Sequence, residues 1–438
     1  MWKNSEVIPP EYDLTKIKIP VAIINSANDG LSNPFDVEIV SRQLSNLIFR
    51  HEMPEKLTSH IDFLFHEPKK LVNTILPTNL IQLYGYPAEN HTVVTDDGYI
   101  ITLHRIPGGK TNKSQNGIPV LLLHGAWICS STWVDNGEES WGFILADEGY
   151  DVWMGNFRDN SYTRQLVDDG TKDEIIGWDK LSVYEVPTIV DYVRNATGFN
   201  QILAIGYSMG TTSTFASLSV NEELNNKIKG FVALAPVSNF KYISSVGAKI
   251  AIFLIRKFPI IFKPLYKDSI LPAKSVRRDF LLRLCPAIGH SSLCKLWFDY
   301  GSGYNPNSFN QTRLPIYLLH TVDTFPDRFL CHWAQGSSKM KMTGYDYGKK
   351  KNFENYNQAT PIEYDLTKIK IPVAIIYSAN DVFSSPIDVE IISRQLSNLI
   401  YKQLLPGELI THLDFLFHEP KKLINTILPV LSSMWNKN

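Results

Sequence analysis

The chain carries nearly the same segment at both of its ends, and this repeat restricts how the chain can fold. Residues 11–77 align without gaps to residues 363–429, each residue lying 352 positions before its counterpart, and about three positions in four are identical. Each copy predicts an apolar strand, a helix, a second strand and another helix. A βαβα unit of this size cannot cover both faces of its own sheet, so at least one copy is expected to complete a larger sheet.

Between the two copies, strand patterns alternate with helix patterns. A hairpin is predicted over 91–106, turning at Asp96-Asp97-Gly98. It is followed by buried strands over 120–125, 151–156, 201–207 and 230–236, with helices over 142–150, 186–197 and 212–221 between them. This alternation is typical of the α/β class and predicts a mostly parallel, doubly wound sheet. From about residue 237 to residue 347 it gives way to an aromatic-rich insertion that we expect to be helical.

These patterns divide the chain into four parts. Residues 1–77 form a pendant repeat, residues 78–236 the first part of the core, residues 237–347 a cap or lid, and residues 348–438 the second part of the core. Each boundary follows a change from one pattern to the next, and the two core parts together form one sheet.

Composition and charge exclude several classes of protein. Hydrophobic residues make up 44% of the chain, enough for a large core. Lys plus Arg number 43 and Asp plus Glu 44, with no basic block, so no nucleic-acid partner is expected. The most apolar run, over 250–262, is interrupted by Arg256, Lys257 and Pro259, which argues against a transmembrane helix. The first residues lack the apolar stretch of a secretory signal peptide.

The cysteines and the glycosylation sequons give evidence on the cellular compartment in which the protein resides. Four cysteines are too few for a disulfide scaffold, although Cys285 and Cys294 are close enough in sequence to close one loop. Candidate glycosylation sites, which would matter only in a chain that enters the secretory route, are Asn90, Asn112, Asn195 and Asn310.

The segment Gly206-Tyr207-Ser208-Met209-Gly210 lies between a predicted strand and a predicted helix. In a nucleophile elbow the serine occupies a strained turn that exposes its hydroxyl, and the two glycines let strand and helix approach closely. An ordinary glycine-rich turn is the alternative, but the flanking strand and helix favour the elbow. Ser208 is therefore predicted to be a nucleophile.

A serine hydroxyl needs a histidine to accept its proton, and that histidine needs a carboxylate to orient it. Asp381 follows a strand and His412 lies in the turn after the next strand, so both are expected at the carboxyl edge of the sheet, near Ser208. The backbone N–H groups of Met209 and Ala126 are expected to bind the oxyanion. His124, at the end of a strand, is expected to be a buried residue that braces this loop.

These segments resemble the acid lipase family, the gastric and lysosomal lipases and steryl ester hydrolases of the α/β-hydrolase class. The resemblance extends from about Leu80 to Leu431, and the matching stretches are YGYPAENHTVVTDDGYIITLHRIP, WGFILADEGYDVWMGNFRDNSYTR, GYSMGTT, HWAQ, SANDVFSSPIDV and THLDFLF. It implies an α/β-hydrolase fold with an inserted helical cap, and a serine hydrolase that cleaves esters of water-insoluble lipids with Ser208, Asp381 and His412.

The resemblance carries further implications. It implies a disulfide between Cys285 and Cys294, and with it an oxidising compartment, so the protein is expected to be secreted or lysosomal. No cofactor or metal is expected. The apolar cap run over 250–262, with basic residues inside it, suits a lid that makes transient contact with a lipid surface. An ordinary amphipathic cap helix packed on the core is the alternative interpretation of this run.

The chain departs from the family in ways that affect the expected site. Tyr207 and Met209 stand where the family usually has His and Gln, and Trp127 adds bulk in the oxyanion loop. The N-terminal copy contains a second pair, Asp29 and His60, equivalent to Asp381 and His412.

We expect the C-terminal pair to act, because it follows the cap in the family's order. The N-terminal copy is then a pendant segment, most simply the tail of a tandem copy, or else a segment that exchanges into a second molecule. Two other functions stay open at this point: a soluble carboxylesterase or thioesterase, and a pseudo-hydrolase that binds lipid without cleaving it.

Overall fold

The computed structural model describes most of the chain in two compact units, Met1–Gly85 and Tyr86–Asn438. The described residues are 13–17, 21–26, 34–45, 47–53, 77–111, 117–158, 160–165, 177–238, 240–258, 303, 305, 313, 317, 323, 328–406, 410–418 and 420–437. Cys285, Cys294, Asn112, Asn310, Asp29 and His60 lie outside these residues. Each unit is considered by itself.

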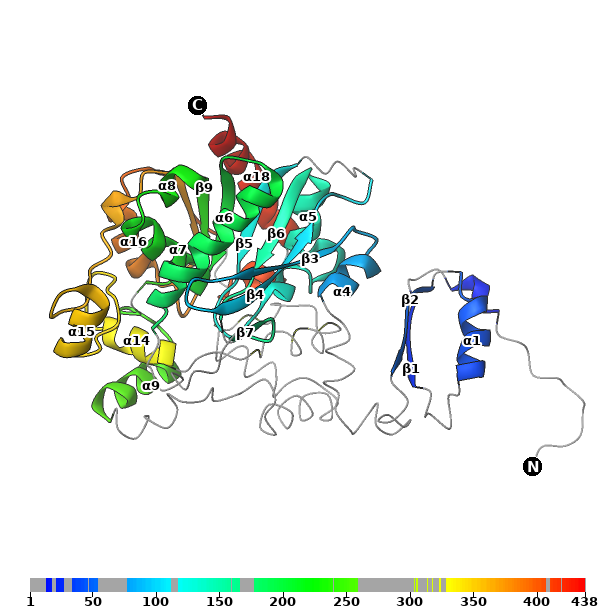
Figure 1. Ribbon diagram of the computed structural model, residues 1–438, viewed down its shortest axis with the longest axis horizontal. Helices are drawn as coiled ribbons and strands as arrows, with labels where there is room; N and C mark the ends of the chain where they lie inside the picture. Colours follow the sequence, from blue (N-terminus) through cyan, green and yellow to red (C-terminus); the bar gives the residue numbers. More distant parts are fainter. Residues whose placement is uncertain are drawn as a thin grey trace, which may run out of the picture. The chain divides into compact units, whose positions relative to one another are not determined.

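A nine-stranded sheet, counted over the described residues, forms the centre of the larger unit (Figure 1). Its strands lie in the order β11-β10-β9-β8-β5-β6-β4-β3, and β7 pairs with β4. The run from β6 to β11 is parallel, whereas β3, β4 and β7 are antiparallel. The strands are β3 (Glu89–Val94), β4 (Tyr99–Ile106), β5 (Ile118–Leu123), β6 (Tyr150–Gly155), β7 (Thr163–Gln165), β8 (Ile202–Tyr207), β9 (Ile228–Leu234), β10 (Val373–Tyr377) and β11 (Leu399–Leu404).

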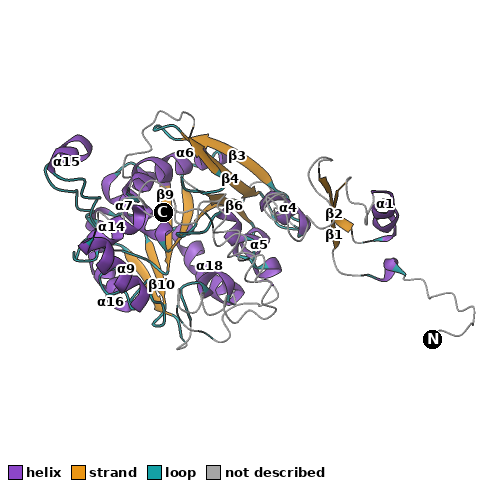
Figure 2. Ribbon diagram, turned by 90° about the horizontal axis from the view of Figure 1, so that it is seen from below, coloured by secondary structure: helices purple, strands orange, loops and turns teal. Residues whose placement is uncertain are grey.

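Helices cover both faces of this sheet (Figure 2). On one face lie α5 (Trp141–Asp147) and α18 (Pro420–Asn436), and on the other lie α6 (Val186–Thr197) and α7 (Met209–Val220). Strands β6 and β8 are buried along their whole length, as expected for parallel strands covered on both sides. The fold is therefore the predicted doubly wound α/β sheet.

Local sequence signals account for the ends of the central helices. Helix α6 spans the predicted residues, with Pro187 in its first turn, where the missing N–H is not needed. It ends at Gly198, whose φ of 75° is the left-handed conformation that glycine adopts at least cost. Val190 of α6, Phe215 of α7 and Ile392 of α16 (Pro386–Gln395) belong to one buried apolar cluster beneath the sheet.

Two helices of the insertion are described, α9 (Val246–Lys257) and α14 (Arg328–Gly336), and they pack against each other. Residues 259–327 lie outside the described part apart from five single positions. Helix α15 (Lys349–Tyr356) leads from the insertion back to the sheet. These two helices agree with the helical character expected for the insertion, whereas residues 240–245 and 337–347 lie outside helices.

The smaller unit repeats the local structure of the C-terminal segment. It contains β1 (Val21–Ser26), α1 (Pro34–Gln43), β2 (Leu47–Met53) and α4 (Pro77–Leu83). The pairing of β1 with β2 is parallel, with an irregularity after the first residue, as in the pairing of β10 with β11. Among the described strands β1 pairs with β2 alone, whereas β10 also pairs with β9.

The different surroundings of the two copies change the burial of equivalent side chains. Val40 is 40% exposed in the smaller unit, whereas its counterpart Ile392 is 1% exposed in the larger one. The C-terminal copy therefore completes the large sheet, which confirms that at least one copy does so.

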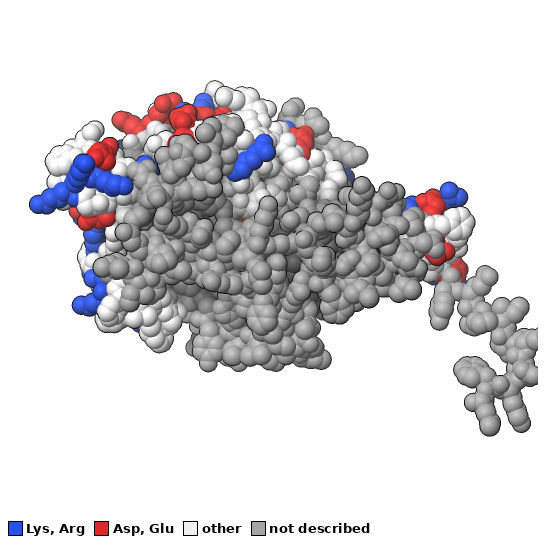
Figure 3. Space-filling model, turned by 60° about the horizontal axis from the view of Figure 1, so that its bottom comes forward, with Lys and Arg blue, Asp and Glu red and all other residues white. Residues whose placement is uncertain are grey.

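Charged side chains are visible on part of the surface of the described residues (Figure 3). In the face shown in Figure 3, acidic and basic side chains lie in mixed groups. Within the described part of the chain, every helix is too short or too polar to span a bilayer.

Candidate active site

The link between β8 and α7 is a strained turn that carries Ser208. Its φ of 52° and ψ of −116° lie outside the regions that a residue with a side chain normally adopts. The N–H of Ser208 donates to the carbonyl oxygen of Leu234 at 3.0 Å, which fixes the turn against β9. This is the geometry of a nucleophile elbow.

The glycine at position 210 is required by the space around it. A Cβ atom there would lie 2.4 Å from the carbonyl oxygen of Leu123, well inside van der Waals contact with the backbone. A Cβ at Gly206 would lie 2.9 Å from the carbonyl oxygen of Gly210. Strand and helix thus approach one another as closely as the motif indicates.

The structure brings Ser208, Asp381 and His412 together from three places in the chain. His412 Nδ1 lies 2.7 Å from Asp381 Oδ2, and His412 Nε2 lies 2.8 Å from Ser208 Oγ. The three residues are 7%, 1% and 6% exposed, in the order Ser208, Asp381, His412. Because the carboxylate accepts the Nδ1 proton, Nε2 is left with a lone pair that can accept the serine proton.

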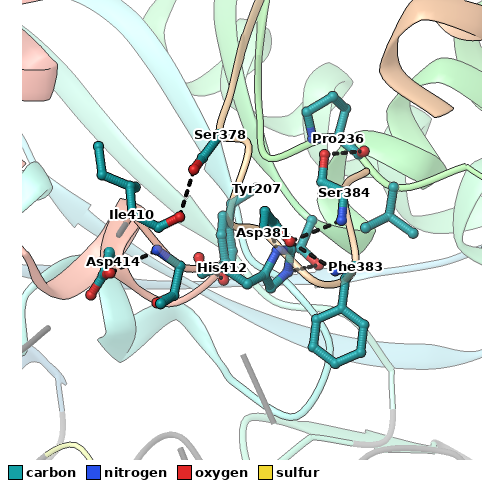
Figure 4. A network of polar contacts seen from close by, with 12 residues as sticks. Tyr207, Pro236, Ser378, Asp381, Phe383, Ser384, Ile410, His412 and Asp414 are labelled. Carbon is teal, nitrogen blue, oxygen red and sulfur yellow. Dashed lines mark hydrogen bonds and ion pairs between the residues drawn. The ribbon is translucent and has the colours of Figure 1, made fainter. Parts of the chain in front are cut away.

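Asp381 is held by the backbone of its own loop (Figure 4). Its Oδ1 accepts hydrogen bonds from the N–H groups of Phe383 and Ser384, each at 2.9 Å. The hydroxyl of Ser384 donates to the carbonyl oxygen of Pro236 at 2.7 Å and so ties this loop to the chain that follows β9. One carboxylate oxygen is thereby fixed by the loop, and the other is directed at His412.

The loop that carries His412 has anchors on both sides. Thr411 N–H donates to Asp414 Oδ2 at 2.7 Å, and Asn305 Nδ2 donates to the same oxygen at 2.8 Å. Burial raises the pKa of the Asp414 carboxyl, and these two hydrogen bonds oppose the rise. Ser378 Oγ donates to the carbonyl oxygen of Ile410 at 2.5 Å.

His124 braces the loop after β5, as expected from the sequence. Its Nδ1 donates to the carbonyl oxygen of Gly125 at 2.7 Å, and its Nε2 accepts from the N–H of Phe157 at 3.3 Å. Burial lowers the pKa of His124 to about 4, so the ring is neutral near pH 7. Its two ring nitrogens are engaged by backbone groups, so the ring orients the loop.

Met209, one of the two residues expected to donate to the oxyanion, directly follows the nucleophile. Met209 is the first residue of α7, where a helix N–H has no acceptor within the helix. A Cβ on Gly125 would lie 3.0 Å from Ser208 Cβ, so the loop that continues into Ala126 packs directly against the nucleophile.

Two residues support this region through contacts that the sequence does not predict. The N–H of Asp323 donates to the carbonyl oxygen of Trp127 at 2.9 Å, and its carboxylate accepts from Ser161 Oγ at 2.6 Å. The hydroxyl of Tyr207 donates to the carbonyl oxygen of His412 at 2.9 Å. No local pattern marks Asp323, whereas Tyr207 stands inside the elbow motif and was noticeable there as an unusual residue.

Two of the glycosylation candidates and two cysteines lie among the described residues. Asn90 in β3 and Asn195 in α6 are exposed. Cys129 and Cys331 are buried, and burial raises the pKa of the Cys129 thiol well above its usual range.

Comparison with known proteins identifies relatives across most of the chain. Two family models match: "Partial alpha/beta-hydrolase lipase region" at residues 77–137 and "alpha/beta hydrolase fold" at residues 118–253. The gastric triacylglycerol lipase of Bos taurus is 34% identical over 365 residues, covering 81% of this chain and 90% of that protein. Lipase member M of Homo sapiens is 32% identical over 414 residues, covering 90% of this chain and 96% of that protein.

Two further comparisons agree with these. The lysosomal acid lipase/cholesteryl ester hydrolase of Macaca fascicularis is 33% identical over 364 residues, covering 81% of this chain and 90% of that protein. A solved structure from Acinetobacter baumannii AYE matches with a TM-score of 0.50 at 14% identity, covering 84% of this chain and 97% of that one. This structural likeness bears on the fold alone.

Proposed function

Because this chain belongs to the acid lipase family of α/β-hydrolases, we propose that it cleaves the ester bonds of lipids, triacylglycerols or steryl esters, with Ser208 as nucleophile. The observation that carries the proposal is the hydrogen-bonded series from Asp381 through His412 to Ser208, at 2.7 and 2.8 Å. Both contacts lie within the range required for proton transfer and orientation.

In the proposed mechanism the Ser208 oxygen attacks the ester carbonyl while its proton passes to His412 Nε2. Asp381 holds the ring and stabilises the imidazolium that forms. His412 then gives the proton to the leaving alcohol, and the acyl group remains on Ser208. Water, deprotonated by the same nitrogen, attacks this acyl-enzyme and releases the fatty acid.

The oxyanion of each tetrahedral intermediate is assigned to the N–H groups of Met209 and Ala126. The N–H of Met209 suits this role because it lies at the start of α7, where it has no acceptor within the helix, and directly follows the nucleophile. A donor aimed at the oxyanion contributes about a hundredfold or more to the rate.

Helix α9 is proposed to contact the lipid surface. Val246, Ile250, Phe253 and Leu254 are exposed on this helix, while Ile252 packs against the buried cluster. Lys249, Arg256 and Lys257 add positive charge to the same helix. An exposed apolar stripe with basic neighbours is the pattern of a helix that lies in the interface of a membrane or lipid droplet.

We infer the compartment from relatives that are named gastric and lysosomal lipases. We assign this chain to the same secreted or lysosomal route, with a disulfide between Cys285 and Cys294 and glycosylation at exposed asparagines such as Asn90 and Asn195. The C-terminal copy of the repeat supplies the acid and the histidine.

The test compares two substrates with one protein. Wild type is expected to hydrolyse an emulsified triglyceride or cholesteryl ester faster than a short-chain soluble ester, and Ser208→Ala is expected to abolish both activities. Faster turnover of the soluble ester would favour a soluble carboxylesterase. Failure of a fluorophosphonate probe to label Ser208 in the folded wild type would contradict the enzymatic function and favour lipid binding without hydrolysis.

A further inference from the structure

The side chain of Tyr207 connects the nucleophile strand to the histidine loop (Figure 4). Tyr207 is the last residue of β8, directly before Ser208, and it is buried. Its hydroxyl donates to the main-chain carbonyl oxygen of His412 at 2.9 Å. Its ring also lies beside the His412 imidazole, with 5.1 Å between the ring centroids and 36° between the planes.

We propose that Tyr207 is a positioning residue that sets the distance between the His412 imidazole and the Ser208 hydroxyl. The phenol hydroxyl fixes the backbone at position 412, and the ring limits the movement of the imidazole. The inference rests on the proposed function, because it takes His412 as the base that activates Ser208.

The other anchors of the histidine loop do not provide this link. Ser378 holds Ile410, and Asp414 holds Thr411; both anchors belong to the same C-terminal segment as the histidine itself. They tie the loop to itself and to the end of β10, not to β8. Tyr207 bonds to His412 from the strand that carries the nucleophile, so it couples the two reacting side chains directly.

The ring of Tyr207 is held in place on its other side. A Cβ atom on Gly125 would lie 2.9 Å from Tyr207 Cε1, so the oxyanion loop packs closely against the phenol. The ring of Phe383, from the loop of Asp381, also lies against the imidazole, with 5.1 Å between centroids. The imidazole is thus bounded by aromatic rings from the elbow and from the acid loop, and its orientation depends on both.

The hydrogen bond from Tyr207 is present across the working range of pH. Burial, with the charges of Asp381 and Asp414 nearby, raises the pKa of Tyr207 well above its usual value. The hydroxyl therefore stays protonated and remains a donor. Removing it should lower activity by a similar factor at every pH.

The test is Tyr207→Phe, which removes the hydroxyl and keeps the ring. The matched control is Tyr86→Phe, because Tyr86 is also buried and its hydroxyl donates to Asp147 at 2.7 Å, far in the sequence from the catalytic residues. With a short-chain soluble ester, we expect Tyr207→Phe to lower kcat about tenfold with KM changed less than about twofold, since one positioning hydrogen bond is lost. Tyr86→Phe should leave kcat unchanged.

A double-mutant comparison separates positioning from general structural damage. In a His412→Ala background, Tyr207→Phe should have no further effect on the residual rate, because no imidazole remains to be positioned. An equal tenfold loss in both backgrounds would overturn the inference. If Tyr207→Phe does not fold, Tyr207→His replaces it, since an imidazole is shorter than a phenol and does not reach the carbonyl oxygen of residue 412.

The outcomes also distinguish this inference from the proposed function. Full activity of His412→Ala would contradict the proposed function itself. Loss of activity in His412→Ala together with wild-type kcat in folded Tyr207→Phe would leave the function intact and overturn the positioning role.

Discussion

Replacing Asp381 by Asn tests the tautomer that the site imposes on His412. In the native site, Asp381 Oδ1 accepts two backbone N–H groups, from Phe383 and Ser384, and Oδ2 accepts from His412 Nδ1. An Asn side chain has one oxygen and one NH₂ group. The two backbone donors require the oxygen, so the NH₂ group must face His412.

This arrangement reverses the protonation of the imidazole. An NH₂ group can only donate, so His412 Nδ1 becomes an acceptor and the ring proton moves to Nε2. Nε2–H then points at Ser208 Oγ, 2.8 Å away, and can no longer accept the serine proton. A wrong tautomer in a triad of this kind costs about 10⁴-fold in kcat, or about 5 kcal/mol of transition-state stabilisation.

The assay is the initial rate of hydrolysis of a soluble ester, measured alongside thermal unfolding. Asp381→Asn should unfold at nearly the wild-type temperature, because all its hydrogen-bonding groups keep a partner. The matched control is Asp29→Asn, the same substitution in the N-terminal copy, which should leave the rate unchanged. A folded Asp381→Asn protein that keeps more than about a tenth of wild-type kcat would refute the reasoning, as would inactivation by Asp29→Asn.

Three further substitutions, one of them paired with a control substitution, test the packing and electrostatics of the fold. Gly210→Ala should cost about 3 kcal/mol or more of unfolding free energy in urea melts, whereas Gly247→Ala, with open space around its Cβ, should change it by less than about 1 kcal/mol. Arg158→Met should cost about 3–5 kcal/mol, because it leaves the fully buried carboxylate of Glu185 without its partner; a loss below about 1 kcal/mol would show that the pair is dispensable. Burial lowers the pKa of His104 to about 3, so below pH 6.5 the unfolded chain binds a proton that the folded chain does not. Wild type should therefore lose about 2 kcal/mol more than His104→Asn between pH 7 and pH 5, and equal losses would contradict this.

The sheet and its main helices could be predicted because their signals are local. Strand β8 is a continuous apolar run, and α6 has a periodic apolar face and ends at Gly198. In both elements the sequence pattern therefore predicts the secondary structure that is found. Strand β7 carried no such signal. It has three residues and exists because Thr163 pairs with Ile101 and Gln165 with Tyr99, contacts that no local window contains.

The candidate site could be predicted from the sequence because of the topology of the sheet. In a parallel sheet the carboxyl ends of strands meet at one edge, so residues following β8, β10 and β11 were expected together, and Ser208, Asp381 and His412 are found together. The contacts that hold these three residues in place could not be predicted from the sequence. Tyr207 bonds to the main chain 205 residues away, and Asp323 bonds to Trp127 from the insertion; both depend on how loops close over the sheet.

The central claim is that the imidazole of the C-terminal copy, at His412, activates Ser208. The most direct measurement is the rate constant for labelling of Ser208 by a fluorophosphonate in full-length His412→Ala and His60→Ala, followed by mass spectrometry of the labelled peptide. The account predicts that labelling slows by about a thousandfold or more in His412→Ala and is unchanged in His60→Ala. Slow labelling in His60→Ala with a normal rate in His412→Ala would contradict it.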